Sequence, residues 1–338
     1  MAKILGASQA WQAVTERLGT RRLRAESVSD IRKMLVSKAA EYEIAKAQET
    51  KRFDDELENL VNELESRRVS LEADLVKREY YIDLDVEFFE IAILLLQNKT
   101  WIVQKILNKS KIQKHKAHVQ RLKAKKKKIR WQLTNDITAL ETAIKNKRDH
   151  KDSIIEDGCS SIKKDVELLK KTISSPELAG AEAELEIIEQ LKKLPDNYYV
   201  VSGITLILDK AKRLDGQWLK SAQIDHLVIA PAGVFVIEAK NWSKEFSEHG
   251  SYFDPYQQVK RASHVCYMIL KDPASKLKTK SMIVHKGAIP EKPEGSYTKV
   301  LRIEEMNNYI LWHKESILSD AEIKEARSLL RVWSQEKF

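Results

Sequence analysis

Residues 27–174 contain no proline and a single glycine, Gly158, and this lack of chain breakers most limits what the chain can fold into. Lys, Glu, Leu, Ile and Ala dominate the segment, a composition typical of long helices. Apolar residues recur there every three or four positions, as a heptad seam that must be buried against another helix requires. The first run comprises Leu57, Val61, Leu64, Leu71 and Leu75, and continues through Ile82, Val86, Phe89, Ile93 and Leu96. We therefore predict a helical coiled-coil arm over residues 27–174.

A second apolar run, over residues 112–144, follows a polar break at Asn108-Lys109-Ser110. The second helix can fold back on the first there as an antiparallel hairpin, or either helix can pair with a second subunit. The residues fit both arrangements, so a homo-oligomer formed through the coiled coil is one expectation. Before the arm, residues 1–26 are predicted to form a short amphipathic helix, over residues 7–18, and a basic link.

The positive charge of the chain, +9 in total, is concentrated in one stretch. No acidic residue occurs from Ile91 to Asn135, so a helix there exposes positive charge on most faces outside its seam. Such a surface favours nucleic-acid phosphates, bound in a salt-dependent and sequence-independent way. The alternatives are pairing with the acidic stretch at residues 54–65 or with a second subunit, and an anionic membrane. The residues expected to contact nucleic acid are Lys123, Lys125, Lys126, Lys127, Lys128 and Arg130.

Several classes of protein are disfavoured by what the sequence lacks. No stretch approaches the ~18 uninterrupted apolar residues of a membrane span, and the first residues lack the apolar core of a signal peptide. The only cysteines, Cys159 and Cys266, provide neither a disulfide framework nor a zinc site. We therefore expect a cytoplasmic protein without a membrane span.

The composition changes after Ser174-Ser175-Pro176, where strand-forming runs begin to alternate with helical ones. The predicted order over residues 178–338 is helix, three strands, helix, strand and two further helices. The strands predicted at residues 224–230 and 234–237 are apolar on both faces, so helices are expected on both sides of the sheet. The fold class is thus a long-helix coiled coil followed by a mixed α/β domain.

Three charged residues lie within these apolar strands, where burying a charge is costly. They are Asp225, Glu238 and Lys240. A four-residue loop over residues 230–233 would place Asp225 directly across from Glu238, and Lys240 would share their face because strand side chains alternate. Two acids and a lysine on adjacent strands are what metal-dependent phosphodiester hydrolysis needs. The pattern therefore indicates a nuclease-type centre.

Four segments of this half resemble the nuclease-related domain (NERD) family, within the PD-(D/E)xK nuclease superfamily. They are residues 180–184, 223–226, 233–241 and 254–258, in the order that the family has them. The resemblance implies a restriction-endonuclease-like αβββαβ core with its acids at one edge of the sheet. It departs from the family at Ala183, where glycine is usual, and at Asp254, where asparagine is usual. The arm lies outside the resemblance.

The resemblance also implies a role for each residue of the site. Asp225 and Glu238 align with ligands of Mg²⁺ or Mn²⁺, the backbone carbonyl of Ala239 is a further ligand, and Lys240 aligns with the catalytic lysine. The helix glutamate of the family aligns with Glu184, which binds the metal directly or through water, and its neighbour Glu182 is the competing candidate. Gln258 aligns with the family's glutamine and is expected to contact substrate or to brace Lys240. The catalytic set is therefore Glu184, Asp225, Glu238, Lys240 and Gln258.

These features together predict a metal-dependent nuclease that hydrolyses phosphodiester bonds, with DNA as the expected substrate. The arm is expected to mediate oligomerisation, to bind nucleic acid or to regulate cleavage, with a protein partner as a possible trigger. A further expectation is that the nuclease defends the cell against phage or other foreign DNA. The alternative is a nucleic-acid-binding scaffold that has kept a nuclease fold without cleaving.

Overall fold

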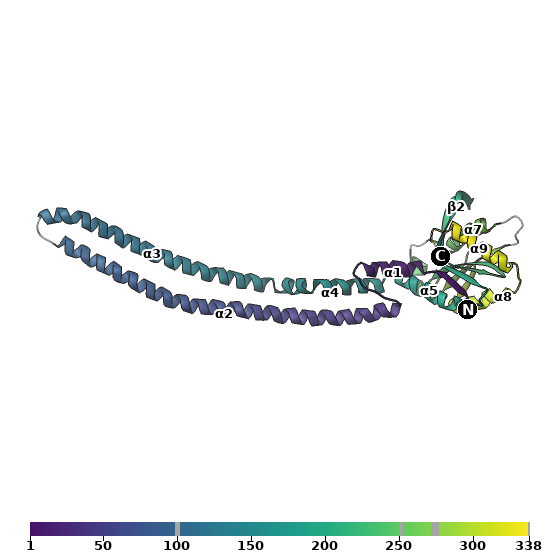
Figure 1. Ribbon diagram of the computed structural model, residues 1–338, viewed down its shortest axis with the longest axis horizontal. Helices are drawn as coiled ribbons and strands as arrows, with labels where there is room; N and C mark the ends of the chain where they lie inside the picture. Colours follow the sequence, from purple (N-terminus) through teal and green to yellow (C-terminus); the bar gives the residue numbers. More distant parts are fainter. Residues whose placement is uncertain (99–101, 251–252, 272–276, 337–338) are drawn as a thin grey trace. The chain divides into compact units, whose positions relative to one another are not determined.

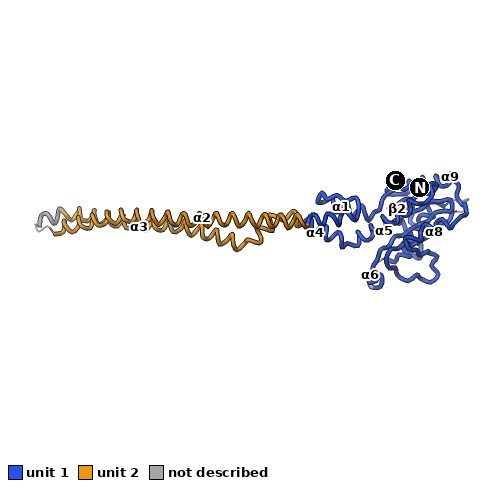
Figure 2. Tube along the Cα trace, turned by 90° about the horizontal axis from the view of Figure 1, so that it is seen from below, with its two compact units in different colours: residues 1–38, 164–338 blue, residues 39–163 orange. Residues whose placement is uncertain are grey.

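The computed structural model describes residues 1–98, 102–250, 253–271 and 277–336. The chain forms two compact units (Figure 2). Residues 1–38 and 164–338 make up the first unit, and residues 39–163 make up the second. The second unit consists of arm residues, and the first contains the α/β domain together with the N-terminal segment, although residues 1–26 were predicted to be separate from that domain.

The arm is an antiparallel pair of long helices (Figure 1). Most of it is contributed by α2 (Val28–Gln97, 70 residues) and α3 (Ile102–Asp149, 48 residues), followed by α4 (Lys151–Ile173). Leu64, Ile82 and Ile93 of α2 are buried in the seam, as are Val119 and Ile144 of α3. Within the described part of the chain, no helix is both long enough and apolar enough to cross a membrane.

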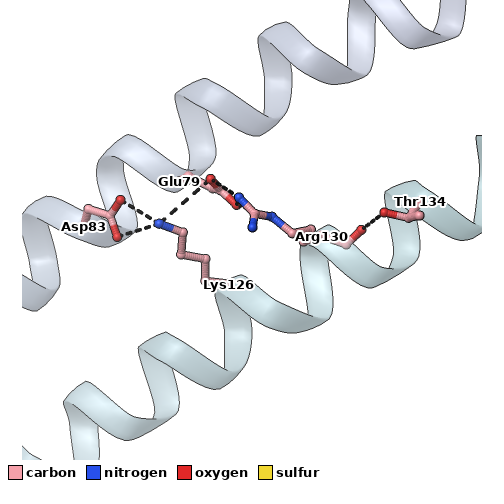
Figure 3. A network of polar contacts seen from close by, with 5 residues as sticks. All are labelled: Glu79, Asp83, Lys126, Arg130 and Thr134. Carbon is pink, nitrogen blue, oxygen red and sulfur yellow. Dashed lines mark hydrogen bonds and ion pairs between the residues drawn. The ribbon is translucent and has the colours of Figure 1, made fainter.

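Ion pairs between α2 and α3 fix the register of the hairpin. Near the middle of the arm, Nζ of Lys126 lies 2.7 Å from Oδ2 of Asp83, and Arg130 places two nitrogens 3.0–3.1 Å from the carboxylate of Glu79 (Figure 3). Lys147 pairs with Glu56 at 2.5 Å, so partners further along α3 lie earlier on α2. The sequence left open whether the two runs pair within one chain, and the structure shows that they do.

The position of the chain reversal was predicted incorrectly. The reversal was expected near Asn108-Lys109-Ser110, but α2 ends at Gln97 and α3 begins at Ile102, so the helix continues through that tripeptide. Asn108 is buried, and its side-chain amide donates to the carbonyl of Leu96 at 3.3 Å. In the sequence, this polar residue suggests a helix break. In the structure, it provides a hydrogen bond to a backbone carbonyl at the end of the neighbouring helix.

The first unit is built on a six-stranded mixed sheet in the order β1-β2-β3-β4-β5-β6. Strands β2, β3 and β4 are antiparallel neighbours, whereas β1 pairs with β2 in parallel and β5 and β6 extend the other side in parallel. The bounds are β1 Lys3–Gly6, β2 Tyr199–Leu214, β3 Gln217–Ala230, β4 Gly233–Lys240, β5 Thr279–His285 and β6 Lys299–Arg302.

Helices cover both faces of this sheet, as the doubly apolar strands predicted. On one face, α7 (Pro255–Leu270) and α9 (Asp320–Trp333) pack over an apolar core that includes Ile229 and Val236. On the other face, α5 (Pro176–Leu191) and α8 (Ile303–Trp312) pack over a second core that includes Phe235. The short helix α6 (Lys244–His249) follows β4.

The β3–β4 turn has the predicted register with a shorter loop than expected. Ile229 pairs with Val234, as the four-residue loop required, but Ala230 also pairs with Gly233, so only Pro231 and Ala232 lie between the strands. Gly233 adopts a φ of 112°, a conformation that glycine reaches without steric cost. Because the register is the same for both loops, the side chains of β3 and β4 keep their predicted faces.

The N-terminal segment completes the first unit. Strand β1 pairs with the start of β2, and α1 (Gln9–Gly19) then packs on α5, with Val14 and Leu18 buried in the same cluster as Leu178. Gly203 of β2 has a φ of 63°, and a Cβ there would lie 2.1 Å from the carbonyl oxygen of Ala7. The absence of a side chain at Gly203 therefore allows the link between β1 and α1 to lie directly against the sheet.

Candidate active site

A cleft of about 560 Å³ lies in the first unit where β3 and β4 part. It is lined by the α4–α5 junction, α5, the middle of β3, the end of β4 with the segment that follows it into α6, and the start of α7. The predicted site residues among its lining are Glu184, Asp225, Glu238, Ala239, Lys240 and Gln258. The structure thus gathers at one cleft residues that lie up to 74 positions apart in the sequence.

Asp225 marks the point where the strand pair ends. The last ladder pair is His226 with Ile237, and the same register places Asp225 across from Glu238, as expected, although these two residues are not themselves a ladder pair. The carboxylate of Asp225 instead accepts the backbone N–H of Ala239 at 2.8 Å. This hydrogen bond aims the carboxylate of Asp225 sideways, toward the end of β4.

Glu238, Lys240 and Gln258 form a chain of contacts across the cleft. Nζ of Lys240 lies 2.5 Å from Oε1 of Glu238 and donates to Oε1 of Gln258 at 3.2 Å. Glu238 is 2% exposed and the side chain of Lys240 is 13% exposed, so this ion pair is largely shielded from water. Gln258, at the first turn of α7, is therefore placed to hold the lysine in position.

The carboxyl groups of the cleft are buried with too little positive charge nearby to offset the cost of ionising them. Burial raises the pKa of Glu238 well above its ordinary value, and the negative charge of Asp225 adds to the rise. The pKa of Asp225 is also raised by burial, against the opposing effect of Lys240. Burial likewise raises the pKa of Glu184 to about 7, and repulsion from Asp225 contributes. One lysine does not balance three carboxylates, so the site favours a further positive charge.

Of the two candidate glutamates of α5, Glu184 lines the cleft and Glu182 does not. Glu184 is 8% exposed, and its Oε2 atom is buried without a hydrogen-bond partner. Glu182 instead points to the surface, where it lies 3.7 Å from Lys286 and 3.9 Å from Arg32. An unpaired buried carboxylate oxygen is costly in a folded protein unless a ligand or ion satisfies it.

The N-terminal segment also contributes to this site, which the sequence did not predict. Hydrogen bonds from the Ser8 hydroxyl and the Ala10 backbone oppose the rise in the pKa of Glu184. Ser8 is 1% exposed, and it is also the N-cap of α1, where it accepts the backbone N–H of Trp11 at 2.9 Å. The start of α1 thus faces Glu184. A Ser at a helix start is common, so no signal in the sequence linked it to residues more than 170 positions away.

Aromatic and polar residues after β4 close one side of the cleft. Trp242 and Phe246 line it with ring centroids 5.4 Å apart, and Nζ of Lys240 lies 5.4 Å from the centre of the Trp242 ring. The side-chain amide of Asn241 donates to the carbonyl of Ala179 at 2.9 Å. This bond joins the end of β4 to the start of α5, and so holds the two walls of the cleft together.

The donor set of the cleft fits a hard divalent cation. Mg²⁺ and Mn²⁺ prefer oxygen ligands, and Mg²⁺ needs only one or two carboxylates because it retains several waters. Asp225, Glu238 and the orphaned oxygen of Glu184 provide such ligands. Among the described residues, no three acidic, histidine or cysteine side chains converge closely enough to enclose a cation by themselves. An ion held here would therefore complete its coordination with water.

The six basic residues expected to bind nucleic acid divide into two groups on α3. Lys123, Lys126 and Arg130 form ion pairs with Glu90, Asp83 and Glu79 of α2, and not with the acidic stretch at residues 54–65 that the sequence had offered as a partner. Lys125, Lys127 and Lys128 are exposed and form no ion pair with any residue that the structure describes. Among these six residues, the positive charge that is free of ion pairs therefore lies on Lys125, Lys127 and Lys128.

Residues 179–285 match the family model of the nuclease-related domain. The match runs from within α5 through β2, β3, β4, α6 and α7 to the end of β5, and hence contains the predicted site residues from Glu184 to Gln258. No curated protein and no solved structure matched the chain. The resemblance noted in the sequence is thus confirmed for the C-terminal half, while Ser8 and the arm lie outside the matched region.

Proposed function

We propose that this protein is a metal-dependent nuclease of the PD-(D/E)xK type that hydrolyses phosphodiester bonds of DNA. The observation that carries the proposal is the arrangement of Asp225, Glu238 and Lys240 in one cleft of a nuclease-related domain. Buried carboxylates with raised pKa values and a shielded lysine are unusual in a purely structural role and are typical of catalytic sites.

In this proposal Asp225, Glu238 and the carbonyl of Ala239 would hold the metal ion, with Glu184 as a ligand directly or through water. A bound Mg²⁺ or Mn²⁺ would supply Lewis-acid chemistry, lowering the pKa of a bound water and neutralising charge on the phosphate. Nζ of Lys240 would orient the attacking water or donate to the oxygen on which negative charge develops. Gln258 would position that ammonium group by accepting a hydrogen bond from it through Oε1.

The arm would bind or localise the nucleic acid. Lys125, Lys127 and Lys128 present charge that is not used within the described part of the hairpin, so they are the residues proposed to contact phosphates. Replacing all three by Ala is expected to weaken DNA binding and to reduce its salt dependence by about three charge equivalents. The same binding and salt dependence in the triple variant would remove the arm from the interface.

A cleavage assay tests the proposed activity. Supercoiled plasmid, linear duplex, single-stranded DNA and RNA are each incubated with the protein in Mg²⁺, Mn²⁺ or EDTA. Cleavage of DNA that depends on the metal, with 5′-phosphate and 3′-hydroxyl ends, is the expected result. Binding without cleavage under every condition would instead support the non-cleaving scaffold.

A role in defence against foreign DNA follows if the nuclease is active in cells. Overexpression of the wild-type protein is then expected to slow growth, because host DNA is also a substrate. Lys240→Ala, which removes the proposed catalytic ammonium, is expected to restore growth. Equal toxicity of the two proteins at matched expression would contradict this role.

A further inference from the structure

Helix α2 carries a second apolar face in addition to the seam that α3 covers. Its members, which we call the outer stripe, are Val69, Ala73, Val76, Tyr80, Leu84, Phe88, Ile91 and Leu95. The seven large side chains are 44–70% exposed. Seam residues Ile82 and Ile93 are 7% and 9% exposed, and Leu84 and Leu95 follow them by two positions, about 200° around the helix. The outer stripe therefore lies on the side of α2 that faces away from α3.

The spacing of the outer stripe reads the same in both directions along the helix. Its successive steps are 4, 3, 4, 4, 4, 3 and 4 residues. When two copies of the stripe are laid antiparallel about Ile82, Tyr80 meets Leu84 and Val76 meets Phe88, and each apolar member faces another. A contact with two-fold symmetry requires this self-complementarity, because residue i must contact j and j must contact i. An unrelated partner would impose no such symmetry.

The exposed area is also in the range that a stable dimer needs. With on the order of 170 Å² for each of the large side chains, at about 60% exposure, two copies together present about 1,400 Å² on the stripe. Specific protein–protein interfaces bury about 1,200–2,000 Å² in total. Exposed apolar patches of this size on a soluble protein mark an interaction site.

The charges around the outer stripe disfavour an anionic membrane as its occupant. Exposed Glu72 and Glu87 lie beside the stripe, and a membrane surface of negative potential would repel them. Between residues 69 and 95, α2 carries seven acidic residues and only two basic ones, Lys77 and Arg78. The basic residues of α3 nearest to α2 are engaged with Glu79, Asp83 and Glu90. A membrane-binding helix has the opposite arrangement, with Lys and Arg flanking its apolar face.

We propose that the outer stripe docks against the same stripe of a second copy of this chain, antiparallel and centred on Ile82. Two α2 helices then form the inner layer of the assembly, and each copy's α3 covers the outer side. This inference does not depend on the proposed nuclease activity.

Sedimentation of the full-length protein tests the association. The wild-type protein at micromolar concentration is expected to have twice the 39.0 kDa mass of the chain. The double variant Tyr80→Glu/Leu84→Glu places four charges at the centre of the interface, and we expect it to dissociate at least tenfold more readily. Ala124→Glu, an exposed position on α3, is the matched control and is expected to leave the mass unchanged. A monomeric wild-type protein, or a double variant that dimerises as tightly, would overturn the proposal.

Cysteine crosslinking tests the orientation without introducing charge. A Val76→Cys chain mixed with a Phe88→Cys chain is expected to give the mixed crosslink, whereas a parallel pair would crosslink each variant to itself. Native Cys159 and Cys266 are both buried, so they contribute little background. Flotation with vesicles containing anionic lipid tests whether a membrane, rather than a second copy of the chain, covers the outer stripe. Vesicle binding by a wild-type protein that shows no mixed crosslink would assign the stripe to a membrane instead.

Discussion

Nζ of Lys240 lies 2.5 Å from Oε1 of Glu238, two positions earlier on the same strand. Their side chains share a face of β4 because strand residues alternate, so the spacing in the sequence directly produces the ion pair. Glu238 is nearly inaccessible to water, and Lys240 is the cation that compensates it. In the proposed enzyme a metal ion would share that carboxylate, which would leave the ammonium group free to face the substrate.

Divalent metal is expected to stabilise the protein, because it neutralises carboxylates that repel one another. At a Mn²⁺ concentration of 100 times its dissociation constant, the gain is about 2.7 kcal/mol, and each kcal/mol raises Tm by about 2–4 °C in a domain of this size. Asp225→Asn should lose most of the shift. Asp215→Asn, at an exposed turn, is the control and should retain it. Thermal unfolding with and without Mn²⁺ measures this effect, and an undiminished shift in Asp225→Asn would place the metal elsewhere.

The two glutamates of α5 are predicted to differ in their importance for cleavage. Glu184→Gln should lower the cleavage rate at least about tenfold, because it removes a charged ligand from the cleft. Glu182→Gln should change the rate by less than about twofold, because Glu182 makes only surface ion pairs. Single-turnover rates at saturating metal measure both variants. The reverse order of effects would make Glu182 the functional acid.

Ser8 should affect the site although it lies outside the matched family region. Ser8→Gly removes the hydroxyl that contacts Glu184, and glycine preserves the helix start at a cost of only a few tenths of a kcal/mol. We expect a several-fold higher metal concentration for half-maximal cleavage. Thr15→Ala, which removes an exposed hydroxyl from the same helix, should behave as wild type. Identical metal dependence in Ser8→Gly would limit Ser8 to capping α1.

His226 should make the fold sensitive to acid. Burial lowers its pKa from the ordinary 6.5 to about 3, so the folded state holds it neutral while the unfolded state takes up a proton below pH 6.5. Its contribution to stability is complete above that pH and is lost progressively as the pH falls toward 3. Relative to pH 8, the loss at pH 5 is about 2 kcal/mol. His226→Gln keeps a group that can bond to Ser202 and should lack this loss.

Urea denaturation of both proteins in EDTA, at pH 8 and pH 5, isolates the effect of His226. The cleft carboxylates have raised pKa values and shift stability in the opposite direction, but they are present in both proteins. The difference between the two pH-dependent losses therefore reports His226. Equal losses in the wild-type protein and in His226→Gln would contradict the assignment.

Local patterns in the sequence predicted much of this structure. The absence of chain breakers predicted the long helices, and the doubly apolar strands predicted helices on both faces of the sheet. The register of β3 and β4 followed from the turn, because a slip of one residue would have moved Asp225 to the opposite face of the sheet from Glu238. That register and the alternation along β4 brought Asp225, Glu238 and Lys240 to one cleft.

The features that the sequence did not reveal depend on contacts between distant segments. Strand β1 has only four residues, and its partner lies almost 200 positions later, so no local pattern predicted that it extends the sheet. The contact of Ser8 with Glu184 follows from that pairing. Similarly, the sequence around Asn108 suggests a helix break, and only the hydrogen bond from Asn108 to the carbonyl of Leu96 explains why a polar residue lies within the helix. Local patterning gives no information about which distant residues meet.

The single-turnover cleavage rate of Lys240→Ala is the measurement that tests the proposed mechanism most directly. Lys244→Ala is its control, because Lys244 is 83% exposed on α6 and makes only a surface ion pair with Glu248. With DNA and Mg²⁺, we predict a loss of at least about 100-fold for Lys240→Ala, with DNA binding retained, and a rate within about twofold of wild type for Lys244→Ala. Cleavage by Lys240→Ala at the wild-type rate would show that this cleft is not the catalytic centre.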